Sequence, residues 1–90
     1  MKKLILSLKE EYFNDIKNGN KIEEYRLYNE YWKRRLINRE YDSIEFTLGY
    51  PKKEDSERRI NKKYIGYELR EIQHKHFGNE TVEVFVIKFE

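Results

Sequence analysis

The 90-residue chain contains no cysteine, one proline, four glycines and no long hydrophobic run. Without cysteine it can form no disulfide framework, no thiolate zinc site and no cysteine nucleophile, which fits a reducing compartment. No apolar stretch approaches the roughly 20 residues of a membrane-spanning helix. The apolar run that begins at Leu4 stops at Lys9, short of the roughly 7 to 15 residues of a signal peptide. We therefore expect a cytoplasmic protein that does not contact membranes.

The chain also has little net charge, because 19 lysines and arginines are nearly balanced by 17 aspartates and glutamates to give a formal charge of +2. A strongly basic nucleic-acid-binding protein would show a much larger excess, so any basic patch must be local. A chain of this length buries only about 60 to 65 % of its unfolded surface. Since 16 % of the residues are aromatic, large side chains are present to fill that core. We expect one folded domain, residues 1–90, with a thin core.

Hydrophobic periodicity and turn residues predict five strands and two helices. The strands are expected over 4–8, 21–27, 43–50, 64–72 and 81–90, and the helices over 10–18 and 29–37. The highly charged stretch 52–62 between two strands predicts an exposed loop. This order of elements favours an α+β domain built around a small, mostly antiparallel β-barrel.

Several of these elements carry more specific signals. The first strand is apolar enough to be buried largely on both faces, and the last strand needs cover on both faces, as the closing strand of a barrel would have. Asn18-Gly19-Asn20 predicts a helix end, because glycine and asparagine tolerate the left-handed conformation found there. Gly66 predicts a bulge or a close backbone approach in its strand. Ser7 has the spacing to Glu10 of a capping box, but it can equally remain in the first strand.

The segment from Gly19 to Arg26 carries the strongest candidate site. Strand alternation places Glu24 and Arg26 on one face, whereas Lys21 has the opposite parity and must reach across from the turn before the strand. The three side chains could form an ion-pair network that pins the first helix to the sheet. They could also line a cleft in which Arg26 presents its fork to a phosphate or base edge, Glu24 accepts hydrogen bonds from an exocyclic amine, and Lys21 supplies charge.

Aromatic and basic residues alternate between Tyr28 and Arg35, a composition used to stack single-stranded bases. Helical spacing favours another interpretation, in which Tyr28, Trp32 and Leu36 form a packing stripe. Lys33 and Arg34 then form a solvated basic rim. The stretch 52–63 has six basic and three acidic residues, which suits either a solvated connection or an arm that contacts a nucleic-acid backbone.

Other patterns do not support a metal site or a catalytic pair. His74 and His76 could both ligate one metal from a strand, but no third ligand lies near them in sequence. The adjacent carboxylates of Glu23 and Glu24 point in different directions and so do not form a paired acid and base. We expect no cofactor and no metal.

The chain resembles the ASCH domains, a family within the superfamily of barrels similar to the PUA RNA-binding domain. The resemblance rests on the apolar strand 4–8, the helix ending at Asn18-Gly19, the pattern Gly19-x-Lys21-x-x-Glu24-x-Arg26 and the closing strand 84–89. It implies a PUA-like barrel with a cleft beside the strand that carries Glu24 and Arg26, and binding of RNA or modified nucleosides. One branch of the family hydrolyses acetylcytidine with a lysine, a threonine and a distant glutamate. The lysine matches Lys21, but the threonine falls where this chain has Glu24, and the distant glutamate has no counterpart that we can place.

The predicted function is therefore an RNA- or nucleotide-binding module. Its cleft is expected to be lined by the cationic and acidic side chains of Lys21, Glu24 and Arg26, with help from Lys9, Lys33 and Arg34. One alternative is an amidohydrolase acting on an acylated nucleoside such as acetylcytidine, with Lys21 and Glu24 as its catalytic residues. A second alternative is a protein–protein adaptor that docks through exposed tyrosines.

Overall fold

The structure, a computed structural model, describes residues 2–73 and 80–90. The described residues form an α+β fold with a five-stranded sheet, two α-helices and one short 3-10 helix. In chain order the elements are β1 (Lys3–Leu8), α1 (Glu10–Lys17), β2 (Glu23–Leu27), α2 (Glu30–Leu36), β3 (Ser43–Leu48), η1 (Ser56–Arg58), β4 (Arg59–Gln73) and β5 (Thr81–Phe89). Among these helices none is long and apolar enough to cross a membrane.

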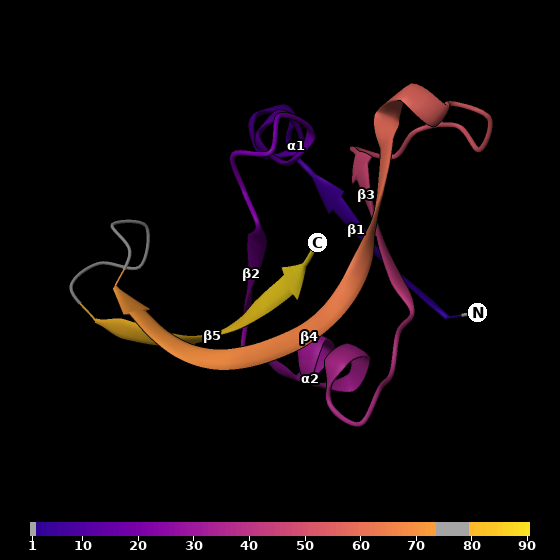
Figure 1. The fold of residues 1–90 in the computed structure, drawn as a ribbon. Helices are drawn as coiled ribbons and strands as arrows, with labels where there is room; N and C mark the ends of the chain where they lie inside the picture. The colour runs from indigo at the N-terminus through magenta and orange to yellow at the C-terminus, as the bar shows by residue number, and fades with distance from the viewer. Residues whose placement is uncertain (1, 74–79) are drawn as a thin grey trace.

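The sheet is mostly antiparallel, as predicted. Its strand order is β1-β3-β4-β5-β2, with β1 and β3 parallel and each of the other neighbouring pairs antiparallel. The long strand β4 curves so that its first part pairs with β3 and its remainder with β5 (Figure 1). The predicted bulge is confirmed where the register shifts between Tyr64 and Gly66, and Gly66 has a φ of 141°. Within the described residues no ladder joins β1 to β2, so the sheet is open there and a closed barrel stays a prediction.

The helices α1 and α2 lie at opposite ends of the strands that they connect (Figure 1). The end of α1 confirms the predicted stop: the amide of Gly19 donates to the carbonyl of Ile16 at 3.1 Å, and the amide of Asn20 donates to Asp15 at 2.9 Å. This is a Schellman motif, which requires the left-handed conformation that Gly19 adopts at a φ of 77°. The tight turn directs the chain straight into β2.

The prediction for β1 needs two corrections. Leu4, Leu6 and Leu8 are buried, but Ile5 is 48 % exposed, so burial on both faces is wrong. The reason is that β1 is an edge strand whose outer face is left without a covering layer. Ser7 remains in the strand and donates to the carbonyl of Gly49 at 2.8 Å, which excludes it as the helix cap.

The predicted exposed loop over 52–62 is wrong in its last part, because β4 already begins at Arg59 and pairs there with β3. Ile60 packs against the core, and Arg59 reaches the buried carboxylate of Glu45 at 2.9 Å. Because this stretch is highly charged, its sequence did not indicate these inward contacts. The predicted strand over 43–50 is also shorter, since it ends at Leu48 before a left-handed Gly49.

The core lies on the inner face of the sheet, beneath the two helices. Its buried members are Leu4, Leu6, Leu8, Phe13, Ile16, Leu36, Ile44, Phe46, Phe85, Ile87 and Phe89. The predicted two-sided burial of β5 is confirmed from Val84 to Ile87, where every residue is buried. On the outer face, Val86 lies between Tyr25 of β2 and Glu68 of β4. The predicted packing stripe of α2 is also confirmed, because Leu36 is buried and Tyr28 and Trp32 pack against the core.

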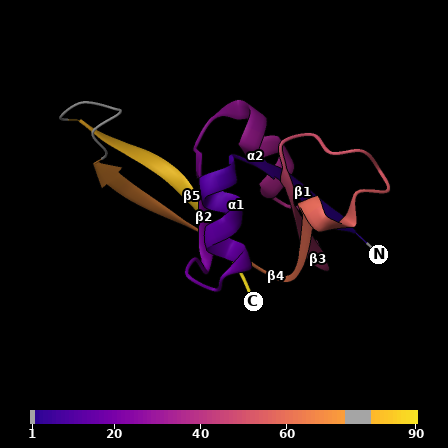
Figure 2. The same cartoon turned by 90° about the horizontal axis from the view of Figure 1, so that it is seen from above.

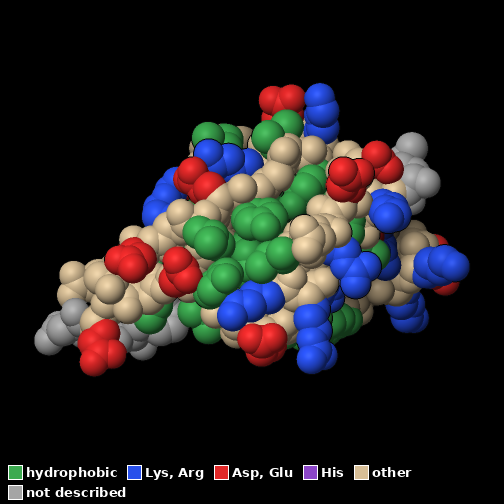
Figure 3. All heavy atoms as spheres, turned by 90° about the horizontal axis from the view of Figure 1, so that it is seen from below, with side chains coloured by type: hydrophobic (Ala, Val, Ile, Leu, Met, Phe, Trp, Pro, Cys, Tyr) green, Lys and Arg blue, Asp and Glu red, His purple; other side chains and the backbone are tan. Residues whose placement is uncertain are grey.

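Beyond the core, β4 and β5 continue as a two-stranded arm that projects from the body of the molecule (Figure 2). Partly buried aromatic side chains reach the surface around the core. On one face, hydrophobic side chains gather in the centre, with basic and acidic side chains around them (Figure 3).

Candidate functional site

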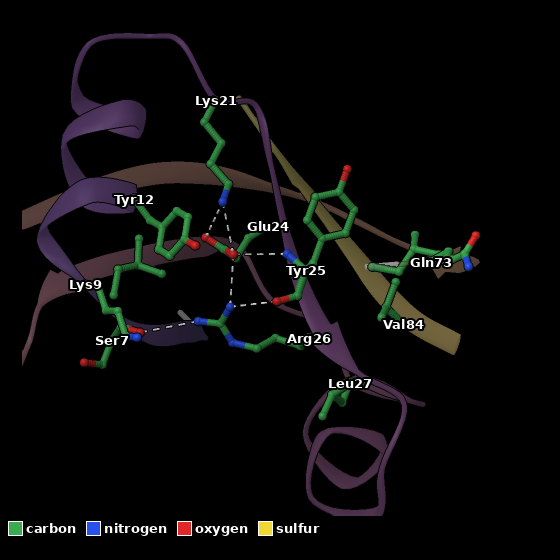
Figure 4. A pocket seen from close by; sticks show the side chains of 12 residues that line it. Ser7, Lys9, Tyr12, Lys21, Glu24, Tyr25, Arg26, Leu27, Gln73 and Val84 are labelled. Carbon is green, nitrogen blue, oxygen red and sulfur yellow. Dashed lines mark hydrogen bonds and ion pairs between the residues drawn. The ribbon is translucent and has the colours of Figure 1, made fainter. Parts of the chain in front are cut away.

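A hollow of about 670 Å³ lies where the sheet is open, between the edge strands β1 and β2. It is lined by the end of β1, the start of α1, the turn before β2, β2 itself and the neighbouring parts of β4 and β5 (Figure 4). We call the gap between the two strands the seam, and this cavity the seam hollow. Its volume lies within the range of about 300 to 1,000 Å³ that is typical of small-molecule sites.

The carboxylate of Glu24 lies in the seam hollow and is only 5 % exposed. Its Oε1 atom accepts hydrogen bonds from the Lys21 ammonium at 3.3 Å and the Tyr25 amide at 3.1 Å, and lies 3.1 Å from Nη1 of Arg26. Its Oε2 atom forms an ion pair with Lys21 at 3.2 Å but accepts no hydrogen bond. A buried acceptor left in this state costs about 1 to 3 kcal/mol. Oε2 has almost no accessible surface of its own, so a donor from a bound molecule would reach it only by displacing the Lys21 ammonium.

Arg26 bridges the two edge strands in place of a ladder. Its Nη1 atom donates to the backbone carbonyl of Tyr25 in β2 at 2.8 Å, and its Nη2 atom donates to the carbonyl of Ser7 in β1 at 3.4 Å. The guanidinium also lies over the ring of Trp32, 5.4 Å from the centroid. The side chain is therefore fixed from several directions, with one edge available to the hollow.

Lys21 lies in the turn before β2, as its parity predicted. Its ammonium lies 4.6 Å from the ring centroid of Tyr12, which holds the flexible stem over α1. Tyr12 is 43 % exposed and faces the hollow. Among the described lining residues, three cationic side chains accompany the single carboxylate, so the seam hollow is formally positive.

One wall of the seam hollow is apolar. Leu27 is 42 % exposed and pairs with the buried Val84 of β5, and Tyr25 is 38 % exposed and pairs with the buried Val86. The hydroxyl of Tyr25 donates to Glu23 at 2.9 Å, and this hydrogen bond, followed by burial, raises the pKa of Tyr25. The ring therefore stays neutral and offers a flat apolar surface on the face of β2 opposite to Glu24 and Arg26.

The structure brings together only some of the predicted site residues. Lys9 lines the seam hollow with the central three, but Lys33 and Arg34 do not. The ammonium of Lys33 lies 4.4 Å from the ring centroid of Tyr28 and pairs with Glu30, and Arg34 is exposed. The helical step of α2 directs Arg35 towards Trp32 instead. Its spacing of three residues from Trp32 is the signal that could have identified it.

A second buried carboxylate, Glu45 in β3, was missed. It is 6 % exposed, and its two oxygens accept hydrogen bonds from Lys3 at 3.4 Å and from Arg59 at 2.9 Å. Arg59 also donates to the carbonyls of Pro51 and Lys52, which ties down the connection before β4. A glutamate within an apolar strand was the only sequence signal for this network.

The described residues contain no cluster of three or more histidines or carboxylates that could hold a metal ion. The predicted pair His74 and His76 lies outside the described residues. No family model, curated protein or solved structure matches the chain. The resemblance to the ASCH domains therefore rests on the sequence pattern from Gly19 to Arg26 and on the order of the elements around it.

Proposed function

We propose that the protein is an RNA- or nucleotide-binding module and that the seam hollow holds one nucleotide. The observation that carries the proposal is the buried carboxylate of Glu24, which lies beneath the Lys21 ammonium in a positively charged hollow and has one oxygen that accepts no hydrogen bond. A nucleotide suits this arrangement, because it combines an anionic phosphate, a planar ring and exocyclic amines that donate hydrogen bonds.

Each part of a nucleotide has a counterpart in the seam hollow. The phosphate pairs with the cationic side chains of Arg26 and Lys9. An exocyclic amine displaces the Lys21 ammonium and donates to Oε2 of Glu24, and the base lies against the ring of Tyr12, which lines the hollow on the same side of β2 as Glu24. The resemblance to the ASCH domains points to the same class of ligand. No cofactor is needed for this role.

The proposal includes a finer description of the fold. We infer a PUA-like barrel that is interrupted at the seam, where the Arg26 side chain joins β2 to the Ser7 carbonyl of β1. The interruption then serves binding, since a closed ladder between β1 and β2 would fill the space of the hollow.

A thermal-shift screen of nucleosides, nucleotides and short RNAs tests the proposal, because a ligand that binds only the folded form must raise the melting temperature. At ten times its Kd, a ligand stabilises the fold by about 1.4 kcal/mol, which is a shift of several degrees for a domain of this size. Arg26→Ala should weaken binding about 10- to 100-fold, because it removes a charge-assisted hydrogen bond.

Arg39→Ala is the matched control. Like Arg26, the exposed Arg39 donates to a backbone carbonyl, that of Arg34, but it does not line the seam hollow. If a folded Arg26→Ala protein binds every responding compound as tightly as the wild type does, the site is misplaced. If nothing in the screen binds and a protein partner is recovered in the presence of nuclease, the adaptor alternative replaces this proposal.

The acylated-nucleoside hydrolase remains the second candidate, because Lys21 and Glu24 are in direct contact inside the hollow. In that reaction water attacks the acetyl carbon, the bond to the cytosine nitrogen breaks, and acetate and cytidine leave. The test is release of acetate from acetylcytidine across a range of pH, with Glu24→Gln as the inactive control. No release at any pH would remove this candidate for that substrate.

A further inference from the structure

A row of stacked arginine and aromatic side chains leads away from the seam hollow. We call it the cation–aromatic row; it consists of Arg26, Trp32, Arg35 and Tyr31. The guanidinium groups of Arg26 and Arg35 both lie over Trp32, each 5.4 Å from the ring centroid. Arg35 also lies 5.4 Å from the ring centroid of Tyr31 and donates to its hydroxyl at 2.6 Å. Side chains that line the hollow are therefore in continuous contact with the exposed side of α2.

The cation–aromatic row follows the open edge of β1. Nη2 of Arg26 donates to the carbonyl of Ser7 at 3.4 Å, and Nη2 of Arg35 donates to the carbonyl of Ile5 at 3.5 Å. Two residues of a strand span about 6.6 Å, a distance comparable to one step between successive phosphates of an extended nucleic-acid strand. The two guanidinium groups thus lie at a spacing that suits neighbouring phosphates.

The outer part of the cation–aromatic row consists of an exposed tyrosine and a half-buried arginine that has no carboxylate partner among the described residues. Tyr31 is 57 % exposed, and none of the ion pairs formed by the described residues includes Arg35. Packing does not require either residue at the surface of α2, because the stripe that covers the core consists of Tyr28, Trp32 and Leu36. Exposed aromatic rings next to arginine are the surfaces on which single-stranded bases stack.

We propose that Arg35 and Tyr31 hold the nucleotide adjacent to the one in the seam hollow, so that the ligand is single-stranded RNA of at least two nucleotides. This inference rests on the proposed function. The base of the second nucleotide stacks on Tyr31, and its phosphate pairs with Arg35, next to the phosphate that Arg26 holds.

A strand could also leave the seam hollow in the other direction, past Lys9. A second hollow there is lined by Lys9, Glu10 and Arg58. Its positive charge is largely balanced, because Arg58 pairs with Asp55 at 3.2 Å and Glu10 contributes a carboxylate. The path along β1 towards Arg35 is therefore the better one for a polyanion.

The test compares the affinities of mononucleotides and short single-stranded RNAs, measured by calorimetry at one salt concentration. In the wild-type protein we expect the oligonucleotide to bind at least about tenfold more tightly than the mononucleotide. Arg35→Gln and Tyr31→Ala should each lose most of this gain, with mononucleotide affinity changed by less than about twofold. Tyr31→Phe keeps the ring and should keep the gain, and Arg58→Gln is the matched loss of charge on the other path.

The outcomes separate this inference from the proposed function. If mononucleotides bind but length gives no gain, or if Arg58→Gln abolishes the gain and Arg35→Gln does not, the inference is overturned while the proposed function stands. If neither mononucleotides nor RNA bind, the proposed function itself fails. Should Arg35→Gln not fold, the exposed Tyr31→Ala and Tyr31→Phe pair decides the question.

Discussion

Two buried carboxylates in this molecule have the same kinds of partner and different surroundings. Glu24 at the seam is 5 % exposed and contacts Lys21 and Arg26, and Glu45 in β3 is 6 % exposed and contacts Lys3 and Arg59. Each network thus consists of one glutamate, one lysine and one arginine. What differs is how the hydrogen bonds are distributed and whether a cavity lies beside them.

Each oxygen of Glu45 accepts a hydrogen bond from a different cation, and Glu45 lines neither of the two hollows described above. At Glu24 the hydrogen bonds converge on Oε1, and Oε2 is left without one in the seam hollow. An unbonded polar atom is not sufficient by itself, since Nε of Arg59 also has no partner. The combination of an incomplete carboxylate with an accessible cavity is what separates a candidate site from a structural network.

The largest expected effect is on stability. Arg59→Ala should lower the free energy of unfolding by roughly 3 kcal/mol, because it leaves the carboxylate of Glu45 buried with only Lys3 as partner. Arg26→Ala should cost only about 1 kcal/mol, since water in the seam hollow can hydrate Glu24. Urea denaturation of both variants measures the difference, and equal losses would contradict the distinction between the two networks.

The next effect concerns selectivity. A carboxylate only accepts hydrogen bonds, so Glu24 should favour a base that presents an amine, such as cytosine, over one that presents a carbonyl, such as uracil. Glu24→Gln provides both a donor and an acceptor and should reduce this preference by about tenfold. Glu45→Gln is the control and should leave the ratio of affinities for cytidine and uridine nucleotides unchanged. Calorimetry on both variants measures it, and a preference that survives in Glu24→Gln would show that another group reads the base.

A smaller effect separates the same two variants in the absence of ligand. Glu45→Gln should lose about 1 kcal/mol more stability than Glu24→Gln, because both oxygens of Glu45 accept hydrogen bonds from cations and only one oxygen of Glu24 accepts any. Thermal and urea unfolding of the two variants under identical conditions test this ordering. The reverse order would place Glu24 in the structural role.

The smallest effect is the dependence of stability on alkaline pH. Tyr64 lies in β4, just after the part that pairs with β3. Its burial, and to a smaller extent the neighbouring Tyr41 and Tyr67, raises its pKa from 10.0 to about 12. The folded state therefore keeps the proton that the unfolded state releases, so this contribution is complete below pH 10 and is lost as the pH rises to about 12. Tyr64→Phe should flatten the decline of the melting temperature over this range. Tyr25→Phe at the seam should flatten it less, since only a hydrogen bond to Glu23 and slight burial raise the pKa of Tyr25.

The sequence predicted those features of the site that depend on local structure. The helix stop at Gly19 and the alternation of β2 are both local, so the convergence of Lys21, Glu24 and Arg26 could be expected before any coordinates were known. Contacts set by the pairing of distant strands could not be predicted. The pair of Glu45 and Arg59 depends on the register of β3 against β4.

Two further differences between the predicted and the observed structure also depend on how distant segments of the chain pack together. Ile5 is exposed because its face of β1 is left without a covering layer, and a single apolar strand carries no information about which of its faces will be covered. Arg35 replaces Lys33 and Arg34 beside the seam because the rotation of α2 about its axis is fixed by the packing of Leu36 in the core. Sequence periodicity identified the buried stripe of this helix but not which basic residue would face β1.

The most direct test of the central claim is a nuclear magnetic resonance titration of the labelled protein with the four ribonucleoside monophosphates. The account predicts that at least one of them shifts the backbone amides of the seam, from Ser7 to Lys9 and from Glu24 to Leu27, and leaves those around Glu45 unchanged. Shifts centred on Glu45, or no shifts with any of the four at millimolar concentration, would contradict it.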